Sequence, residues 1–116
     1  MRELKFRAWD KKINDWFDDD SGELYIELNG NINFGWNGEV MDDYTDRVIL
    51  LQYTGLKESN GVEIYEHSEL DGAYEVIFKN LRYSLRHIHD NDIIDLYDYW
   101  RDKNGEIEVT REYTKV

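Results

Sequence analysis

The chain of 116 residues contains no cysteine and no proline. Without cysteine it can form neither a disulfide framework nor a thiolate zinc site, and it does not require an oxidising compartment. Long apolar runs are also missing, so no segment approaches the roughly 20 apolar residues of a membrane-spanning helix. The charged start, with Arg2, Lys5 and Arg7 and no apolar run behind them, does not fit a Sec-type signal peptide. We therefore expect a cytoplasmic protein that makes no contact with a membrane.

Basic residues are few: 14 Lys and Arg face 26 Asp and Glu, for a formal net charge of −12. Such a charge repels phosphate backbones and anionic surfaces unless the positive charges cluster strongly. The one local basic cluster consists of Lys79, Arg82 and Arg86. Direct nucleic-acid binding is therefore not expected. The acidic excess serves solubility, or it provides a face that meets a basic partner.

Aromatic residues are abundant at 15%, with 4 Trp, 9 Tyr and 4 Phe. Their buried area offsets the entropy cost of ordering, so the chain is predicted to be globular although 34% of its residues are charged. A chain of this length fits one domain, and we expect a single domain over residues 1–116. The rings fit the core of a small barrel, or a groove for a peptide or stacked bases.

Apolar side chains that alternate with polar ones, and β-branched runs, predict strands at residues 2–9, 24–28, 32–36, 48–53, 63–65, 73–78, 81–85 and 107–109. Four Asn-Gly dipeptides separate many of these strands. Asn60-Gly61 is predicted to form a tight hairpin turn, since both residues tolerate positive φ. The pattern predicts an all-β protein, mainly hairpins, with at most a short helix.

Two segments are less clear. The acidic residues 42–46 are predicted to form a loop or one helical turn before the next strand. Residues 93–100 also fit a helical face, through Ile93, Leu96, Tyr97 and Trp100. We favour a strand for them because Asn104-Gly105 and a further alternating run follow at once.

The segment from Gln52 to Lys57, followed by Asn60-Gly61 and Glu63-Ile64-Tyr65, resembles the YopX-like family of bacteriophage proteins, as does the start of the chain, residues 1–10. The resemblance implies an SH3-like barrel with additional N-terminal strands. It also implies a phage or prophage origin, a location in the host cytoplasm and no assigned enzyme activity. The edge strand expected at Arg2 to Ala8 would invite a second copy, so a homo-oligomer is expected.

The nearest approach to a metal site is His87 and His89, which would project from one face of a strand beside Asp90 and Asp92. An exposed loop is the commoner explanation for this pattern. No cofactor is indicated. An EF-hand reading of the acidic run 18–22 fails, because placing Gly22 at the sixth position puts Phe17 first.

Catalytic motifs are also missing: there is no nucleophile elbow and no phosphate-binding loop. His67-Ser68-Glu69 contains triad residue types, yet sequence neighbours on a strand point in different directions. The chain is therefore predicted not to be an enzyme.

The sequence favours a non-enzymatic phage accessory protein that self-associates and binds another protein, such as a basic host or phage protein. The predicted contact charges are Asp18, Asp19, Asp20, Asp42, Asp43 and Asp46. One alternative is a nucleic-acid-associated or DNA-mimic protein of the phage early programme. A minor alternative is a metal-dependent enzyme at His87 and His89.

Overall fold

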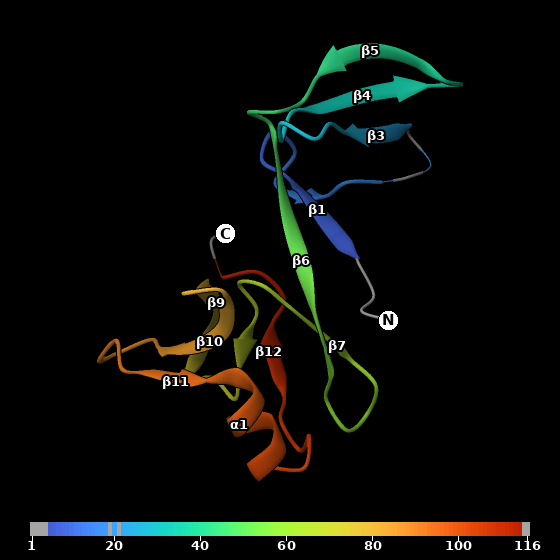
Figure 1. Ribbon diagram of the computed structural model, residues 1–116. Helices are drawn as coiled ribbons and strands as arrows, with labels where there is room; N and C mark the ends of the chain where they lie inside the picture. Colours follow the sequence, from blue (N-terminus) through green and yellow to red (C-terminus); the bar gives the residue numbers. More distant parts are fainter. Residues whose placement is uncertain (1–4, 19, 21, 115–116) are drawn as a thin grey trace. The chain divides into compact units, whose positions relative to one another are not determined.

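The computed structural model of the protein describes residues 5–18, 20 and 22–114 (Figure 1). These residues form antiparallel strands and one short helix, so the predicted all-β class is confirmed. The strands are β1 (Phe6–Asp10), β2 (Asp15–Trp16), β3 (Glu23–Ile26), β4 (Ile32–Trp36), β5 (Glu39–Asp43), β6 (Val48–Lys57), β7 (Glu63–Tyr65), β8 (Glu69–Leu70), β9 (Tyr74–Lys79), β10 (Arg82–His87), β11 (Ile93–Asp95) and β12 (Val109–Arg111); the helix is α1 (Leu96–Asp102). They belong to three sheets, with the orders β2-β1-β6-β7, β3-β4-β5 and β11-β10-β9-β8-β12. The SH3-like barrel stays a prediction.

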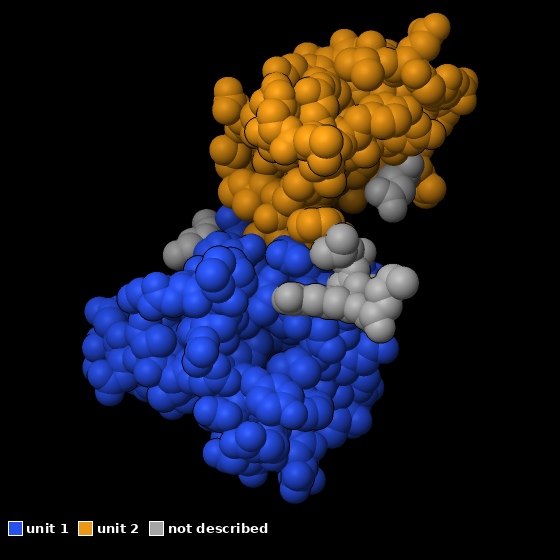
Figure 2. Space-filling model, in the orientation of Figure 1, with its two compact units in different colours: residues 1–5, 52–116 blue, residues 6–51 orange. Residues whose placement is uncertain are grey.

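The chain divides into two compact units, which Figure 2 shows in different colours. Unit 2 is the continuous stretch of residues 6–51, whereas unit 1 combines residues 1–5 with 52–116. Strand β6 runs from one unit into the other. Each unit has a hydrophobic core of its own. That the chain is one domain over residues 1–116 remains a prediction.

The core of unit 2 is built on Ile32, Tyr44 and Val48, with Phe34 and Leu24 packed against it. Leu24 lies opposite Phe34 in the β3–β4 hairpin, as the alternating pattern of residues 24–36 predicts. The rings of Phe34 and Tyr44 stack with their centroids 4.9 Å apart. Such a pair contributes on the order of 1 kcal/mol beyond its buried area.

Gly35 interrupts the alternation inside β4 for a steric reason. A Cβ built on Gly35 would lie 2.4 Å from the carbonyl oxygen of Glu39 and 2.6 Å from the ring of Tyr25. The β4–β5 register also shifts next to this residue, which marks a β-bulge. Glycine is therefore required here by the close approach of β5.

The core of unit 1 is a cluster of six buried side chains, Ile64, Leu70, Val76, Leu85, Leu96 and Ile107. Strands β9 and β10 pair along their whole length, so Val76 lies opposite Leu85 at the centre of the sheet. Both β-strand predictions for this region are confirmed. Helix α1 contributes Leu96, which is the buried residue of that helix.

Residues 93–100 were predicted to form a strand, and the structure corrects that prediction for residues 96–100. Strand β11 ends at Asp95, where the chain turns into helix α1. The carboxylate of Asp95 accepts a hydrogen bond from the backbone N–H of Asp98 at 3.0 Å and so caps the helix. The helical pattern of Leu96 and Trp100 was the better guide, because the capping residue stands directly before it.

The loop predicted at residues 42–46 is also wrong in its first part. Asn37 and Gly38 both have positive φ, 51° and 82°, which is the two-residue hairpin turn that suits strand twist. This turn folds residues 39–43 back onto β4 as strand β5, with Asp42 opposite Phe34. The turn therefore lies later, at residues 45–47.

Asn60-Gly61 forms a hairpin, but not with the predicted backbone. Only Gly61 has positive φ, 90°. Its N–H donates to the carbonyl of Glu58 at 2.9 Å, and the N–H of Glu58 donates to the carbonyl of Val62 at the same distance. This is the longer hairpin loop in which an ordinary turn is followed by a left-handed glycine.

No helix in the described residues is long and apolar enough to cross a membrane.

Candidate functional site

The predicted acidic contact residues lie in unit 2. Asp18 and Asp20 precede β3, Asp42 and Asp43 lie on β5, and Asp46 follows in the turn before β6. Asp19 lies outside the described residues. All five described carboxylates are exposed. The five described carboxylates that the sequence predicted as contact charges are therefore accessible to a partner protein.

Several of these carboxylates also shape the local backbone. Asp18 accepts a hydrogen bond from the N–H of Asp20 at 2.9 Å. Asp43 accepts one from the N–H of Thr45 at 2.8 Å, and hydrogen bonds from Thr45 lower the pKa of Asp43. The charged form of the Asp43 carboxylate is thereby favoured. These groups thus fix turns while their negative charge stays on the surface.

The charge of unit 2 is strongly one-sided. Its 46 residues contain 11 acidic and 4 basic side chains, for a formal charge of −7. Of the basic residues, Arg47 forms an ion pair with Asp10 at 2.8 Å, and the guanidinium of Arg7 lies 3.8 Å from the centre of the Trp16 ring. Unit 2 therefore presents an acidic surface.

A groove of about 360 Å³ lies on the same unit. It is lined by Phe6, Arg7, Ala8, Trp16, Phe17, Leu24, Ile26 and Leu50, contributed by β1, β2, β3 and β6 and the residue after β2. Two of these apolar side chains are well exposed, Phe6 at 46% and Ile26 at 51%. The sequence did not predict this groove, because alternation alone assigns Leu24 and Ile26 to a buried face. Three aromatic side chains line the groove, Phe6, Trp16 and Phe17.

The predicted histidine pair does not share a strand. Strand β10 ends at His87, and His89 lies in the turn that follows. The Nδ1 atom of His87 lies 3.3 Å from the backbone nitrogen of His89 and 3.3 Å from a carboxylate oxygen of Asp90. Within the described part of the chain, no three potential metal-ligand residues come together as a metal site.

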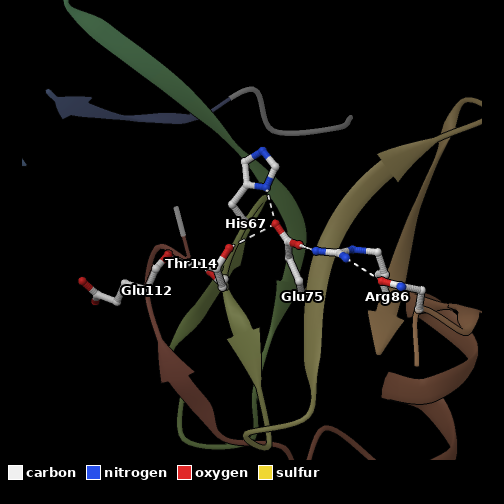
Figure 3. A network of polar contacts seen from close by, with 7 residues as sticks. His67, Glu75, Arg86, Glu112 and Thr114 are labelled. Atoms are coloured by element: carbon white, nitrogen blue, oxygen red, sulfur yellow. Dashed lines mark hydrogen bonds and ion pairs between the residues drawn. The ribbon is translucent and has the colours of Figure 1, made fainter. Parts of the chain in front are cut away.

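Unit 1 contains a buried polar network around Glu75, shown in Figure 3. Glu75 is 2% exposed and binds the guanidinium of Arg86, Nδ1 of His67 at 2.8 Å and the hydroxyl of Thr114 at 3.0 Å. The network ties β9 and β10 to the end of the described chain. Because Arg86 is engaged here, the basic cluster expected with Lys79 and Arg82 loses one of its three members.

His67, Ser68 and Glu69 have the residue types of a catalytic triad, but each binds a different partner. His67 binds Glu75, the hydroxyl of Ser68 donates to the carbonyl of Glu112 at 3.2 Å, and Glu69 accepts from Thr110 at 2.7 Å. The three side chains therefore do not form a relay, as expected for neighbours on an extended chain.

Comparison with known proteins assigns the chain to a family. The sequence model of the YopX protein family matches residues 5–109, which is most of the chain. The chain belongs to the YopX family. No curated protein matches it.

The crystal structure of the protein yopX from Bacillus subtilis shares the YopX fold with this chain. The similarity has a TM-score of 0.56 at 21% sequence identity, and it covers 100% of this chain and 96% of the Bacillus subtilis chain. The match of the family model confirms the predicted family. At this identity the comparison supports the fold alone.

Proposed function

We propose that this YopX-family protein is a non-enzymatic protein-binding module whose acidic unit 2 contacts a basic host or phage protein. One observation carries the proposal: the described predicted contact residues, Asp18, Asp20, Asp42, Asp43 and Asp46, are all exposed on a unit with a formal charge of −7. Complementary charge raises association rates and excludes partners of the wrong sign.

The surroundings of the two most deeply buried acids support binding rather than catalysis. Asp10 and Glu75 are each 2% exposed, and each is paired with an arginine, Arg47 or Arg86. Such pairing balances the charge of a buried carboxylate, which suits a structural role. The groove of unit 2 is lined by apolar side chains and Arg7, with no histidine or carboxylate among its lining residues.

Direct binding of nucleic acid is the weaker alternative. Of the predicted basic cluster, Arg86 binds Glu75, and Arg82 lies 3.6 Å from a carboxylate oxygen of Asp95. Nucleic-acid binding needs several protein cations that can neutralise phosphates and so displace the counterions condensed on the nucleic acid. A DNA-mimic role would use the same acidic surface and differs in its partner, a protein with a DNA-binding groove.

The predicted self-association stays a prediction. It was based on an edge strand near the N-terminus, but β1 lies between β2 and β6 in its sheet. Phe17 N–H also donates to the carbonyl of Ala8 at 2.8 Å. The expectation that this strand offers an open edge is therefore wrong for Ala8. Sedimentation at several protein concentrations measures whether copies associate by another surface.

The test compares three tagged proteins expressed in a bacterial host. The first is the wild type, and the second carries Asn at the six predicted contact positions, 18, 19, 20, 42, 43 and 46. The third carries amides at six exposed acids of unit 1, Asp90, Asp92, Asp98, Asp102, Glu106 and Glu108. Both variants raise the formal charge from −12 to −6.

Asparagine keeps an acceptor oxygen, so the turn hydrogen bonds of Asp18 and Asp43 are retained. We expect a basic protein to co-purify with the wild type and the unit 1 variant and to be lost from the unit 2 variant. Equal recovery with all three would contradict the proposal. Loss of the captured protein after addition of competing DNA would favour the DNA-mimic alternative.

A further inference from the structure

Strand β3 combines an open edge with an apolar groove. It is a terminal strand of the sheet β3-β4-β5, and two of its four residues, Leu24 and Ile26, line the groove of about 360 Å³. Among the described residues, no strand pairs with the outer side of β3. A terminal strand presents a row of backbone donors and acceptors that another chain can use.

The register determines which backbone groups face outward. The N–H of Glu27 donates to the carbonyl of Asn31 at 2.9 Å, which closes the β3–β4 hairpin as a hydrogen-bonded pair. Such pairs alternate along an antiparallel ladder, so Tyr25 pairs with Asn33 in the same way. The residues between them, Leu24 and Ile26, therefore direct their N–H and C=O groups away from β4.

Acidic residues flank β3 along the chain. Asp18 and Asp20 precede β3, Glu23 begins it and Glu27 follows it, and all four are exposed. A second copy of the chain would bring the same four charges together, and opposed like charges cost free energy. A segment with lysine or arginine next to its apolar residues meets the opposite charge. The edge of β3 thus favours a basic partner over another copy.

We propose that β3 binds an extended, basic segment of the partner protein as an added strand. The segment pairs with the backbone of Leu24 and Ile26, places an apolar side chain in the groove beside Trp16, and directs its cations toward the surrounding carboxylates. This inference rests on the proposed function and specifies its binding mode. Strand addition draws its affinity from backbone hydrogen bonds and its specificity from side-chain pockets.

The probe is a short synthetic peptide that alternates lysine and leucine, titrated into the full chain at low and moderate salt. Two analogues serve as controls. One has glutamate in place of lysine, and the other is methylated at every second backbone nitrogen, which blocks strand pairing. We expect the first peptide to bind and to shift the backbone amide signals of Leu24 and Ile26. Both analogues should bind at least about tenfold more weakly, because they lose charge attraction or hydrogen bonds.

Two proline variants separate the two outer edges of the sheet. The N–H of Ile26 faces away from β4, so Ile26→Pro removes an outward donor without removing a ladder bond. Val40→Pro is the matched control on β5. Trp36 and Glu39 close the β4–β5 hairpin as a hydrogen-bonded pair, so Val40, which follows and lies opposite Gly35, directs its N–H away from β4. We expect peptide binding to fall about tenfold in Ile26→Pro and to stay within twofold in Val40→Pro.

Several outcomes would overturn the inference. One is an absence of peptide binding to the wild type. Another is equal binding by the methylated peptide. This comparison uses the wild-type protein, so it does not depend on the folding of any variant. The inference would also be overturned if the six contact-residue substitutions weakened peptide binding while backbone methylation and Ile26→Pro did not. That last result would leave the acidic surface as a binding site and so preserve the proposed function.

Discussion

Arg47 and Asp10 form a two-point ion pair in unit 2: Arg47 Nε lies 2.9 Å from Asp10 Oδ1, and Arg47 Nη2 lies 2.8 Å from Asp10 Oδ2. Asp10 is 2% exposed and ends β1, whereas Arg47 lies in the turn before β6. The backbone adds a third link, since the N–H of Lys11 donates to the carbonyl of Arg47 at 2.9 Å. The pair therefore joins the end of β1 to the start of β6, and it withdraws one of the few cations of this acidic unit from the surface.

Asp10→Asn should lower the free energy of unfolding by about 2 kcal/mol, because it leaves the Arg47 guanidinium without its charged partner in a partly buried place. Asp46→Asn, which removes an exposed carboxylate from the same unit, should change it by less than about 0.5 kcal/mol. Urea unfolding followed by tryptophan fluorescence measures both. Equal effects of the two substitutions would contradict a structural role for the ion pair.

The same pair predicts a pH dependence. Hydrogen bonds from Arg47 hold the pKa of Asp10 below its ordinary value, although burial acts in the opposite direction. The folded state thus favours the ionised form, so this stabilisation is fully present above the unfolded pKa of about 3.9 and is lost as the pH falls through the folded pKa. The stability difference between wild type and Asp10→Asn should be constant near neutral pH and shrink below about pH 4. A difference that grows on acidification would contradict this account.

Glu75→Gln should destabilise unit 1 by about 2 to 3 kcal/mol, because the buried amide cannot balance the charge of Arg86. Glu69→Gln is a matched control: Glu69 lies opposite Glu75 in the sheet and is only partly buried. Its substitution should cost less than about 1 kcal/mol. Amide hydrogen exchange of β9 and β10 measures the effect locally. Unchanged protection in Glu75→Gln would show that the network contributes little to stability.

Burial, and then the hydrogen bond to Asp71, raise the pKa of Tyr99. The Tyr99 hydroxyl donates to Asp71 Oδ2 at 2.6 Å. Asp71→Asn should therefore move the ionisation of Tyr99 to lower pH, since a neutral acceptor no longer opposes the phenolate. Asp90→Asn, which removes an exposed charge from another turn, should leave it in place. NMR of isotope-labelled tyrosine rings through an alkaline titration follows Tyr99 separately, and Tyr99→Phe assigns its signal.

Gly35→Ala should cost more than Gly30→Ala. The added methyl of Gly35→Ala would lie 2.4 Å from the Glu39 carbonyl oxygen, so β5 must move. At Gly30 the space is open, and the cost of about 1 kcal/mol comes from a backbone with φ of 91°. Thermal unfolding of the two variants gives the comparison. A smaller loss for Gly35→Ala would mean that β4 and β5 separate easily.

The sequence predicted the strands best where burial on one face enforces alternation, as at Leu24, Phe34 and Val76. It placed two hairpins, β3–β4 and β6–β7, through their Asn-Gly turns. It missed β5, because Val40 and Met41 are exposed there and no alternation marks a strand whose faces both meet solvent. It misassigned Leu96 to Trp100, because the following Asn104-Gly105 turn was given more weight than the helical apolar pattern and the capping residue Asp95.

The candidate site was also predicted only in part from the sequence. Aspartates are mostly exposed in folded proteins, and the predicted residues 18, 20, 42, 43 and 46 are found on the surface. The groove could not be predicted, because it forms where Phe6, Trp16 and Leu24 come together from separate strands. The pairing of Glu75 with Arg86 depends on the β9–β10 register, which the alternating pattern does not specify.

The central claim is that the acidic surface of unit 2 binds a basic protein. The most direct measurement is the affinity of a purified co-captured protein for the wild type, the six-residue unit 2 variant and the charge-matched unit 1 variant, by calorimetry at two salt concentrations. The account predicts that the unit 2 variant binds at least tenfold more weakly, about 1.4 kcal/mol, while the unit 1 variant binds like the wild type. Equal weakening of the two variants would contradict it, because binding would then follow net charge and not this surface.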